Sequence, residues 1–238
     1  MPPAISIVYD QIRWEEKAIA DIARKRGIEV SLIDSKSRFY DLNGELDIEP
    51  ADVYLQRCLS YYRNLHLTAI LEGKGKLVIN PFQVTLTCGN KLLTTLMLLR
   101  AGLPTPRTII AFTPDAALKA LDAIGYPAVL KPVIGSWGRL IAPLKDRESA
   151  QAILEERDYM YPLYQVYYIQ EMVKRPPRDI RSFVIGDEVV AAIYRYSSSL
   201  DWKTNIARGG KAEYCKVTKE IEELSLKAAE AVGEGILG

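Results

Sequence analysis

Apolar and polar residues alternate along the first third of the chain in two periods, one typical of buried strands and one of amphipathic helices. Each short apolar run is followed by a longer stretch in which apolar residues recur at helical spacing. The pattern predicts strands at residues 5–9, 28–33, 51–55 and 77–79, and helices at residues 15–26 and 64–71. Strands separated by helices of this length are typical of a parallel sheet built from βαβ units.

The middle of the chain predicts a second α/β block. A helix at residues 90–101 ends at Gly102, which is soon followed by two prolines. Thr113-Pro114-Asp115 supplies an N-cap, a proline at the first helical position and an acid in the first turn, so a helix begins there and runs to Ile124. Further strands are predicted at residues 128–130 and 139–143, and a further helix at residues 146–156.

The last third changes from parallel to antiparallel pattern. Strands at residues 180–185 and 188–194 flank Gly186-Asp187, a loop of the kind that closes a tight hairpin. Thr218 then caps a helix with one apolar face that ends at Gly233. These changes predict three parts: an N-terminal α/β domain at residues 1–88, a central subdomain at 89–166 and a C-terminal lobe at 167–238.

Composition narrows the classes of function. The 238 residues are 48% hydrophobic and 26% charged, which is enough apolar material for a real core. A formal net charge of +1 gives no general basic field, so bulk binding to nucleic acid or to anionic membrane is not indicated. The single histidine argues against a histidine-rich metal site, and the three cysteines form no C-x-x-C pair. Because no signal-peptide pattern and no bilayer-length apolar run is found, we expect a cytoplasmic protein.

Lys131, at the end of the strand Val129-Leu130-Lys131, is the first residue that points to chemistry. A buried ammonium needs a fixed anion, and the following Gly135-Ser136-Trp137-Gly138-Arg139 has two glycines through which backbone N–H groups could reach a phosphate. It matches neither a Walker A loop nor a dinucleotide-binding motif. The alternative is an ordinary turn beside a lysine whose ammonium reaches solvent.

Lys91, in the first turn of its predicted helix, is the second candidate. The helix dipole disfavours a cation there, and a bound phosphate would remove the conflict. The alternative is a lysine that faces solvent.

Three further segments carry polar groups whose role the residues alone leave open. Residues 169–173 (Ile-Gln-Glu-Met-Val) suit an adenine slot, or are simply a strand. Arg195 and residues 203–210 suit anion binding, or form a surface strand end and loop. Asp179 lies beside Arg178 and close to Arg181 and could pair with either of them. The alternative to a functional role is that this pair is only a surface salt bridge.

Taken together and in this order, the motifs resemble those of the RimK-like ATP-grasp ligases. Within that family the chain is most similar to the LysX/ArgX type, which joins an amino acid to the C-terminal glutamate of a small acidic amino-group carrier protein in lysine and arginine biosynthesis. The resemblance covers essentially the whole chain. It rests on Lys91, on V-L-K-P around Lys131, and on G-S-W-G-R, Q-E-M-V, D-I-R-S-F-V-I-G and T-N-x-A-R-G-G.

This resemblance implies an α/β ATP-grasp fold, in which an N-terminal parallel α/β domain precedes central and C-terminal α+β lobes that enclose ATP. It implies a site for ATP and a mobile flap over the phosphates. The nucleotide-binding residues it implies are Lys91, Lys131, Gly135, Ser136, Trp137, Gly138, Arg139, Leu140, Ile141, Gln170, Glu171, Met172, Val173, Asp179, Arg181, Lys203 and Asn205, with Glu171, Met172 and Val173 at the adenine and Asp179 near the ribose.

The resemblance also implies substrate and catalytic residues. Arg195, Ile206 and Ala207 would hold the substrate, and Arg208 would join Lys131 as a catalytic cation by clamping an acyl phosphate. Arg57 is a further substrate candidate, because it follows a strand where α/β proteins place ligand loops. The implied partners are the acidic carrier, the amino acid (2-aminoadipate or glutamate) and further copies of the chain in a dimer or tetramer.

The implied reaction consumes ATP and uses Mg²⁺. ATP phosphorylates the terminal side-chain carboxylate of the carrier, and the α-amine of the amino acid then attacks the acyl phosphate. The metal ligands of the family would lie beyond Gly238, so we expect no complete Mg²⁺ site and an incomplete C-terminal lobe. Two alternatives stay open: a RimK-like ligase that adds glutamate to a ribosomal protein or peptide tail, and a non-catalytic ATP-binding module.

Overall fold

A computed structural model of the chain describes residues 2–197, 203–204 and 209–238. Two compact units are present. Unit 1 comprises the chain up to Leu86 together with Gly233–Ile236, and unit 2 comprises Thr87–Val232 with Leu237–Gly238. Within the described residues, no helix is long and apolar enough to cross a membrane. The predicted three-part division at 88/89 and 166/167 stays a prediction.

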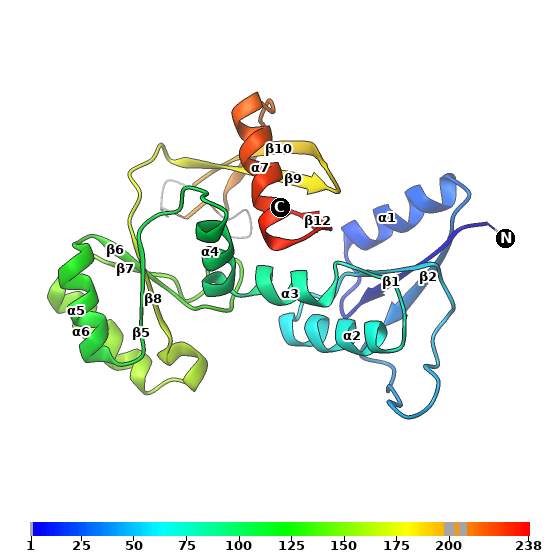
Figure 1. Cartoon of the computed structure of the whole chain (residues 1–238), viewed down its shortest axis with the longest axis horizontal. Helices are drawn as coiled ribbons and strands as arrows, with labels where there is room; N and C mark the ends of the chain where they lie inside the picture. The colour runs from blue at the N-terminus through cyan, green and yellow to red at the C-terminus, as the bar shows by residue number, and fades with distance from the viewer. Residues whose placement is uncertain (1, 198–202, 205–208) are drawn as a thin grey trace. The chain divides into compact units, whose positions relative to one another are not determined.

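Unit 1 is built on a four-stranded sheet in the order β2-β1-β3-β4, of which β1 and β2 are labelled in Figure 1. All three strand pairs are parallel, as the βαβ pattern predicts. Its core is formed by side chains such as Val8, Ile33, Tyr54 and Leu71. The elements are β1 (Ala4–Tyr9), α1 (Trp14–Lys25), β2 (Glu29–Asp34), β3 (Val53–Gln56), α2 (Tyr61–Gly73) and β4 (Val78–Ile79).

Two helices follow, of which only the second was predicted. Helix α3 (Phe82–Gly89) has a weak apolar pattern, and the side chain that accepts from its first N–H group, Glu72, is ten residues away, so the sequence gives little sign of it. Helix α4 (Lys91–Arg100) begins after Asn90, whose side-chain oxygen accepts hydrogen bonds from the backbone N–H groups of Leu92 and Leu93. This cap fixes Lys91 at the first helical position.

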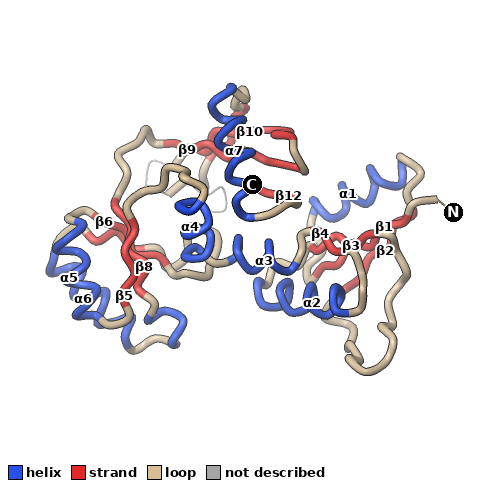
Figure 2. The backbone as a smooth tube through the Cα atoms, viewed as in Figure 1, coloured by secondary structure: helices blue, strands red, loops and turns tan. Residues whose placement is uncertain are grey.

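A second four-stranded sheet, in the order β5-β8-β6-β7, forms the first part of unit 2. Its pairs are antiparallel, and helices α5 and α6 pack on it and on each other (Figure 2). Strand β8 belongs to this sheet, so the chain passes to the third sheet only after Glu171. The elements are β5 (Thr108–Ala111), α5 (Pro114–Ile124), β6 (Ala128–Lys131), β7 (Ala142–Leu144), α6 (Arg147–Asp158), the 3₁₀ helix η1 (Pro162–Gln165) and β8 (Tyr167–Glu171).

The strand predicted at residues 139–143 is wrong in its first half. Strand β7 begins at Ala142, and residues 137–140 form a turn. Trp137 and Leu140 both have positive φ, 57° and 55°, and Gly138 between them has φ 67°. Left-handed backbone cannot continue a strand, so the apolar side chains misled the prediction.

The third sheet has the order β11-β10-β9-β12. Gly186 has φ 61°, which the predicted Gly-first hairpin loop between β9 and β10 requires. Helix α7 packs on this hairpin, with Ala229 against Val184 and Val189. Its elements are β9 (Arg178–Ile185), β10 (Glu188–Tyr196), β11 (Lys211–Tyr214), α7 (Lys219–Val232) and β12 (Ile236–Leu237). The parallel first sheet, the antiparallel second sheet and the antiparallel pairs β9–β10 and β10–β11, together with their helices, confirm the predicted α/β class.

Candidate functional site

A cleft of about 740 Å³ opens in unit 2 and gathers most of the predicted nucleotide residues that the structure describes outside the 135–140 loop. It is contributed by β6, by the end of β8 with the segment that follows it, by β9 and β10, and by residues 203–204. Its lining combines four cationic side chains with apolar and proline surfaces. The lining residues are Pro106, Val129, Lys131, Ile141, Gln170, Glu171, Met172, Val173, Arg175, Pro176, Pro177, Asp179, Arg195, Ser197, Lys203 and Thr204.

Lys131, the last residue of β6, is held by Gln170 of β8. Its Nζ donates to Oε1 of Gln170 at 2.5 Å, and Nε2 of Gln170 donates to the hydroxyls of Thr108 and Tyr168 at 2.9 and 3.2 Å. The Tyr168 hydroxyl in turn shares a 2.8 Å hydrogen bond with Thr95 of α4. Burial lowers the pKa of Lys131. The buried amide of Gln170 therefore holds this lysine in place; Gln170 also lines the cleft, and the nucleotide contact predicted for it stays a prediction.

Lys91 lies outside the cleft lining but close enough to Lys131 for their charges to interact. Burial, and to a smaller extent the charge of Lys131, lowers the pKa of Lys91 to about 8. Its backbone N–H donates to the carbonyl of Val133, and its Nζ donates to the carbonyl of Gly135 at 2.8 Å. Two partly buried ammonium groups that disfavour each other's charge suit a polyanion.

The predicted flap is the loop at residues 135–140, between β6 and β7. It lies largely at the surface, with the Arg139 guanidinium 4.8 Å from the centre of the Trp137 ring. Gly135 has φ 151°, and a Cβ there would come within 3.2 Å of Pro132. Ile141, just after the loop, lines the cleft, whereas Gly135, Ser136, Trp137, Gly138, Arg139 and Leu140 do not.

The end of β8 forms one wall of the cleft. Met172 and Val173 line it together with Val129 and Ile141, as an adenine slot requires. Glu171 also lines it, but its Oε1 accepts a hydrogen bond from the backbone N–H of Arg107 at 2.9 Å. The side chain of Glu171 therefore braces the end of this strand, and the adenine contact predicted for it stays untested.

Asp179 of β9 and Arg195 of β10 face each other across the hairpin and form a two-pronged ion pair. Nε and Nη2 of Arg195 lie 2.8 and 2.9 Å from the two carboxylate oxygens, and the Thr204 hydroxyl donates to one of them. Burial raises the pKa of Asp179, but the hydrogen bonds from Arg195 and Thr204 outweigh it and leave the pKa below its usual range. Asp179, which is predicted to lie near the ribose, therefore contacts Arg195, which is predicted to hold the substrate.

Of the remaining predicted residues of unit 2, the structure describes Lys203 and Arg181. Lys203 lines the cleft and its Nζ donates to the carbonyl of Gly138 at 3.1 Å. Arg181 does not line it; its guanidinium donates to the carbonyl of Gly238, and burial, then the charge of Arg195, lowers its pKa. The predictions for Asn205, Ile206, Ala207 and Arg208 lie outside the described residues.

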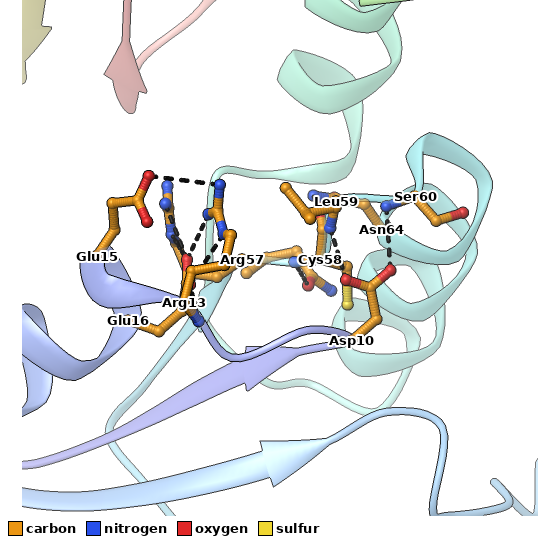
Figure 3. A network of polar contacts seen from close by, with 10 residues as sticks. Asp10, Arg13, Glu15, Glu16, Arg57, Cys58, Leu59, Ser60 and Asn64 are labelled. Carbon is orange, nitrogen blue, oxygen red and sulfur yellow. Dashed lines mark hydrogen bonds and ion pairs between the residues drawn. The ribbon is translucent and has the colours of Figure 1, made fainter. Parts of the chain in front are cut away.

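Arg57, the substrate candidate of unit 1, is part of a polar network at the ends of β1 and β3 (Figure 3). Its Nε and Nη2 both lie 3.0 Å from Oε1 of Glu16, a fully buried carboxylate that also pairs with Arg13 at 2.6 Å. Nearby, Asp10 accepts hydrogen bonds from the backbone N–H groups of Leu59 and Ser60. This network gives Arg57 a structural partner, and its contact with substrate stays a prediction.

Thr204 lies in the stretch 203–210 that the sequence favours for anion binding, and Arg175 lies in the stretch 170–181 that the resemblance assigns to the nucleotide pocket. Other residues of the site were not predicted, among them Pro106 and Ser197 in the cleft lining. Thr108 and Tyr168 carry no motif, and only the sheet register places them beside Gln170. In the part of the chain that the structure describes, no three His, Cys, Asp or Glu side chains gather as a metal site.

Comparison with known protein families matches the chain in two consecutive segments. Residues 5–87 match the LysX preATP-grasp domain, and residues 88–238 match the RimK-like ATP-grasp domain. The two matches cover almost the whole sequence and confirm the resemblance on which the motif predictions rest.

Individual relatives agree with this match. The protein named alpha-aminoadipate–LysW ligase LysX of Sulfurisphaera tokodaii is 39% identical over 237 residues, covering 98% of this chain and 83% of the relative. Glutamate–LysW ligase ArgX of Sulfolobus acidocaldarius is 37% identical over 230 residues, covering 96% and 81%. Among solved structures, a RimK domain ATP-grasp protein from Sphaerobacter thermophilus aligns with a TM-score of 0.76 at 20% identity, covering 98% and 83%. This likeness confirms the predicted ATP-grasp fold.

Proposed function

Because the chain belongs to the RimK-like ATP-grasp ligases, we propose that it joins the α-amino group of 2-aminoadipate or glutamate to a carrier protein. The acceptor is the side-chain carboxylate of the C-terminal glutamate of an acidic amino-group carrier, in lysine or arginine biosynthesis. ATP drives the reaction. The two relatives named above differ in their amino acid and share the carrier in their names, so the carrier is the firmer part of the proposal.

One observation supports this function best: a single cleft is lined both by ammonium groups that suit a polyanion and by a guanidinium that suits a carboxylate. Lys131 and Lys203 supply positive charge to the lining, and Met172 and Val173 supply apolar surface for a base. Arg195 lines the same cleft, held by Asp179 in a fixed orientation. A guanidinium in this orientation suits a substrate carboxylate, because its free N–H groups form a planar fork.

The proposed chemistry has two steps. The terminal carboxylate oxygen of the carrier attacks the γ-phosphorus of ATP, which releases ADP and leaves an acyl phosphate. The unprotonated α-amine of the amino acid then attacks the acyl carbon, and phosphate leaves as the amide bond forms. Lys91 and Lys131 would neutralise phosphate charge in the first step, and Arg208 would clamp the acyl phosphate. No protein nucleophile is required.

Mg²⁺ and the partners complete the proposal. A divalent cation would supply charge neutralisation at the phosphates, and we assign no residue to it. An acidic carrier suits the cationic groups near the cleft, among them Lys203 and Arg195. A homo-oligomer, dimer or tetramer, is part of the proposal and rests on the family resemblance alone.

ADP release tests this function. The protein, ATP and Mg²⁺ are mixed with the carrier and with either 2-aminoadipate or glutamate, and ADP is followed by a coupled assay. We expect ADP only when the carrier is present, and a hydroxamate on the carrier when hydroxylamine replaces the amino acid. Turnover with a ribosomal peptide tail in place of the carrier would favour the RimK-like alternative. ATP binding without turnover on any acceptor would favour a non-catalytic module.

A further inference from the structure

The backbone of the 135–140 loop is held by three cationic side chains from three different parts of unit 2. Lys91 of α4 donates to the carbonyl of Gly135 at 2.8 Å, and Lys203 donates to the carbonyl of Gly138 at 3.1 Å. Arg157 of α6 donates through Nη2 to the carbonyl of Leu140 at 2.5 Å. Cation–carbonyl hydrogen bonds of this kind are stronger than neutral ones. Three of them on six residues fix where this loop runs.

Arg157 differs from the two lysines in its surroundings. Only 6% of it is exposed, and its guanidinium lies 5.7 Å from the centre of the Tyr164 ring. Among the described residues, we find no carboxylate within ion-pair distance of it. Burying a guanidinium without an anion is unfavourable, and an apolar side chain of similar length would fill the same space. The bond to Leu140 is therefore the feature that explains a charge at this position.

The acceptor of that bond lies at a strained point of the backbone. Leu140 has φ 55°, and its side chain is 44% exposed, so packing of the side chain does not hold it there. Left-handed backbone at a bulky residue persists only where surrounding contacts impose it. The guanidinium of Arg157 is the contact that meets this carbonyl.

The three bonds respond differently to a nucleotide. Lys91 is a predicted phosphate ligand and Lys203 a predicted nucleotide-binding residue, so a triphosphate would compete with the carbonyls of Gly135 and Gly138 for them. Arg157 does not line the cleft and has no such competitor. We propose that Arg157 is a positioning residue for the nucleotide-covering loop, anchoring its Leu140 end while the other two bonds exchange with phosphate. This inference rests on the proposed function, since it takes the loop to cover ATP.

Limited proteolysis measures the anchor directly. Trypsin cleaves after Arg139, inside the loop, and the products, residues 1–139 and 140–238, are identified by mass. We expect Arg157→Met to be cut about tenfold faster than wild type, the factor for losing one hydrogen bond from a charged donor. Arg147→Met is the matched control on the same helix. Arg147 pairs with Asp122 at 2.5 Å on an exposed face, and we expect its loss to leave loop cleavage unchanged.

Steady-state kinetics with ATP, Mg²⁺, carrier and amino acid separates positioning from a general structural role. In Arg157→Met the loop must be ordered when ATP binds, so we expect KM for ATP to rise about tenfold. We expect kcat and the KM of the amino acid to change less than twofold. The melting temperature stays the same or rises, because an apolar side chain replaces a buried charge. Arg157→Lys keeps one charged donor, and we expect about threefold faster cleavage than wild type.

The outcomes are distinct. Cleavage and KM for ATP unchanged in a folded Arg157→Met would overturn the anchor. If that variant does not fold, Arg157→Lys decides, and cleavage no faster than wild type then overturns it. A fall in kcat and in the melting temperature, together with a rise in the KM of both ATP and the amino acid, would make Arg157 merely structural. Wild-type ATP binding is measured first by calorimetry, and its absence contradicts the proposed function rather than the anchor.

Discussion

We expect replacement of Lys91 by methionine to stabilise the nucleotide-free protein, although Lys91 is a predicted ATP ligand. Its pKa falls from an ordinary 10.5 to about 8, which corresponds to about 3 kcal/mol of unfavourable charge at pH 7. Because Lys91 is partly exposed, solvent screening reduces this to about 1–2 kcal/mol. Gly135, which loses its donor, is exposed, so its carbonyl can bind water instead.

The pH dependence of the unfolding free energy tests this prediction in a second, independent way. Between about pH 8 and 10.5 the unfolded chain keeps the Lys91 proton that the folded chain has lost. The unfolding free energy of wild type therefore rises with pH in this window relative to the methionine variant. The stability advantage of the variant is full at pH 7 and shrinks as the pH rises above 8.

Urea unfolding at pH 7 and pH 9.5, followed by circular dichroism, measures both the stability difference between variant and wild type and its change with pH. Lys119→Met, at an exposed position of α5, is the control and we expect no change at either pH. A Lys91→Met protein that is less stable than wild type at pH 7, or a difference that does not depend on pH, would refute the reasoning. Calorimetry on the same variant is expected to show weaker ATP binding.

Three further predictions concern the cleft and the carrier. Lys131→Ala is expected to weaken ATP binding at least about 100-fold in calorimetry while far-UV circular dichroism stays the same, with Lys145→Ala as the exposed control; unchanged binding contradicts the role of Lys131. Gln170→Leu removes the acceptor of Lys131 and two donated hydrogen bonds, so urea unfolding is expected to show a loss of about 2–4 kcal/mol, and a loss near zero contradicts the buried chain. Carrier binding, measured by surface plasmon resonance, is expected to weaken about tenfold from 50 to 500 mM salt; an affinity independent of salt argues against charged recognition.

Elements with their own local signals were predictable from the sequence. Thr113 and Pro114 mark the start of α5, and the structure confirms the cap, with the Thr113 hydroxyl accepting from the N–H of Ala116. Gly186-Asp187 marks the hairpin in the same way, because only a few residue types fit its first position. The turn at residues 137–140 was missed because two of its left-handed residues, Trp137 and Leu140, are not glycine, and the contact of Arg157 with Leu140 joins residues 17 apart in the chain.

The same distinction between local signals and distant contacts holds for the residues of the cleft. Lys131, Met172, Val173 and Asp179 line one cleft, and each stands in a motif that the family resemblance uses. Arg195 and Lys203 line the same cleft from outside those motifs. The family resemblance does not predict the hydrogen bonds and ion pairs that these residues form with other residues of the site. That Gln170 orients Lys131, and that Asp179 holds Arg195, depends on the register of β6 with β8 and of β9 with β10. Such pairs join residues far apart in the chain, which no local pattern records.

The mass of the carrier after reaction tests the central claim most directly. The protein is incubated with ATP, Mg²⁺, the carrier and 2-aminoadipate or glutamate, and the carrier is analysed by mass spectrometry. The proposed function predicts a gain of one amino-acid residue, located by fragmentation on the C-terminal glutamate, dependent on ATP and absent with Lys131→Ala. A carrier of unchanged mass with both amino acids, from a protein that binds ATP, would contradict it.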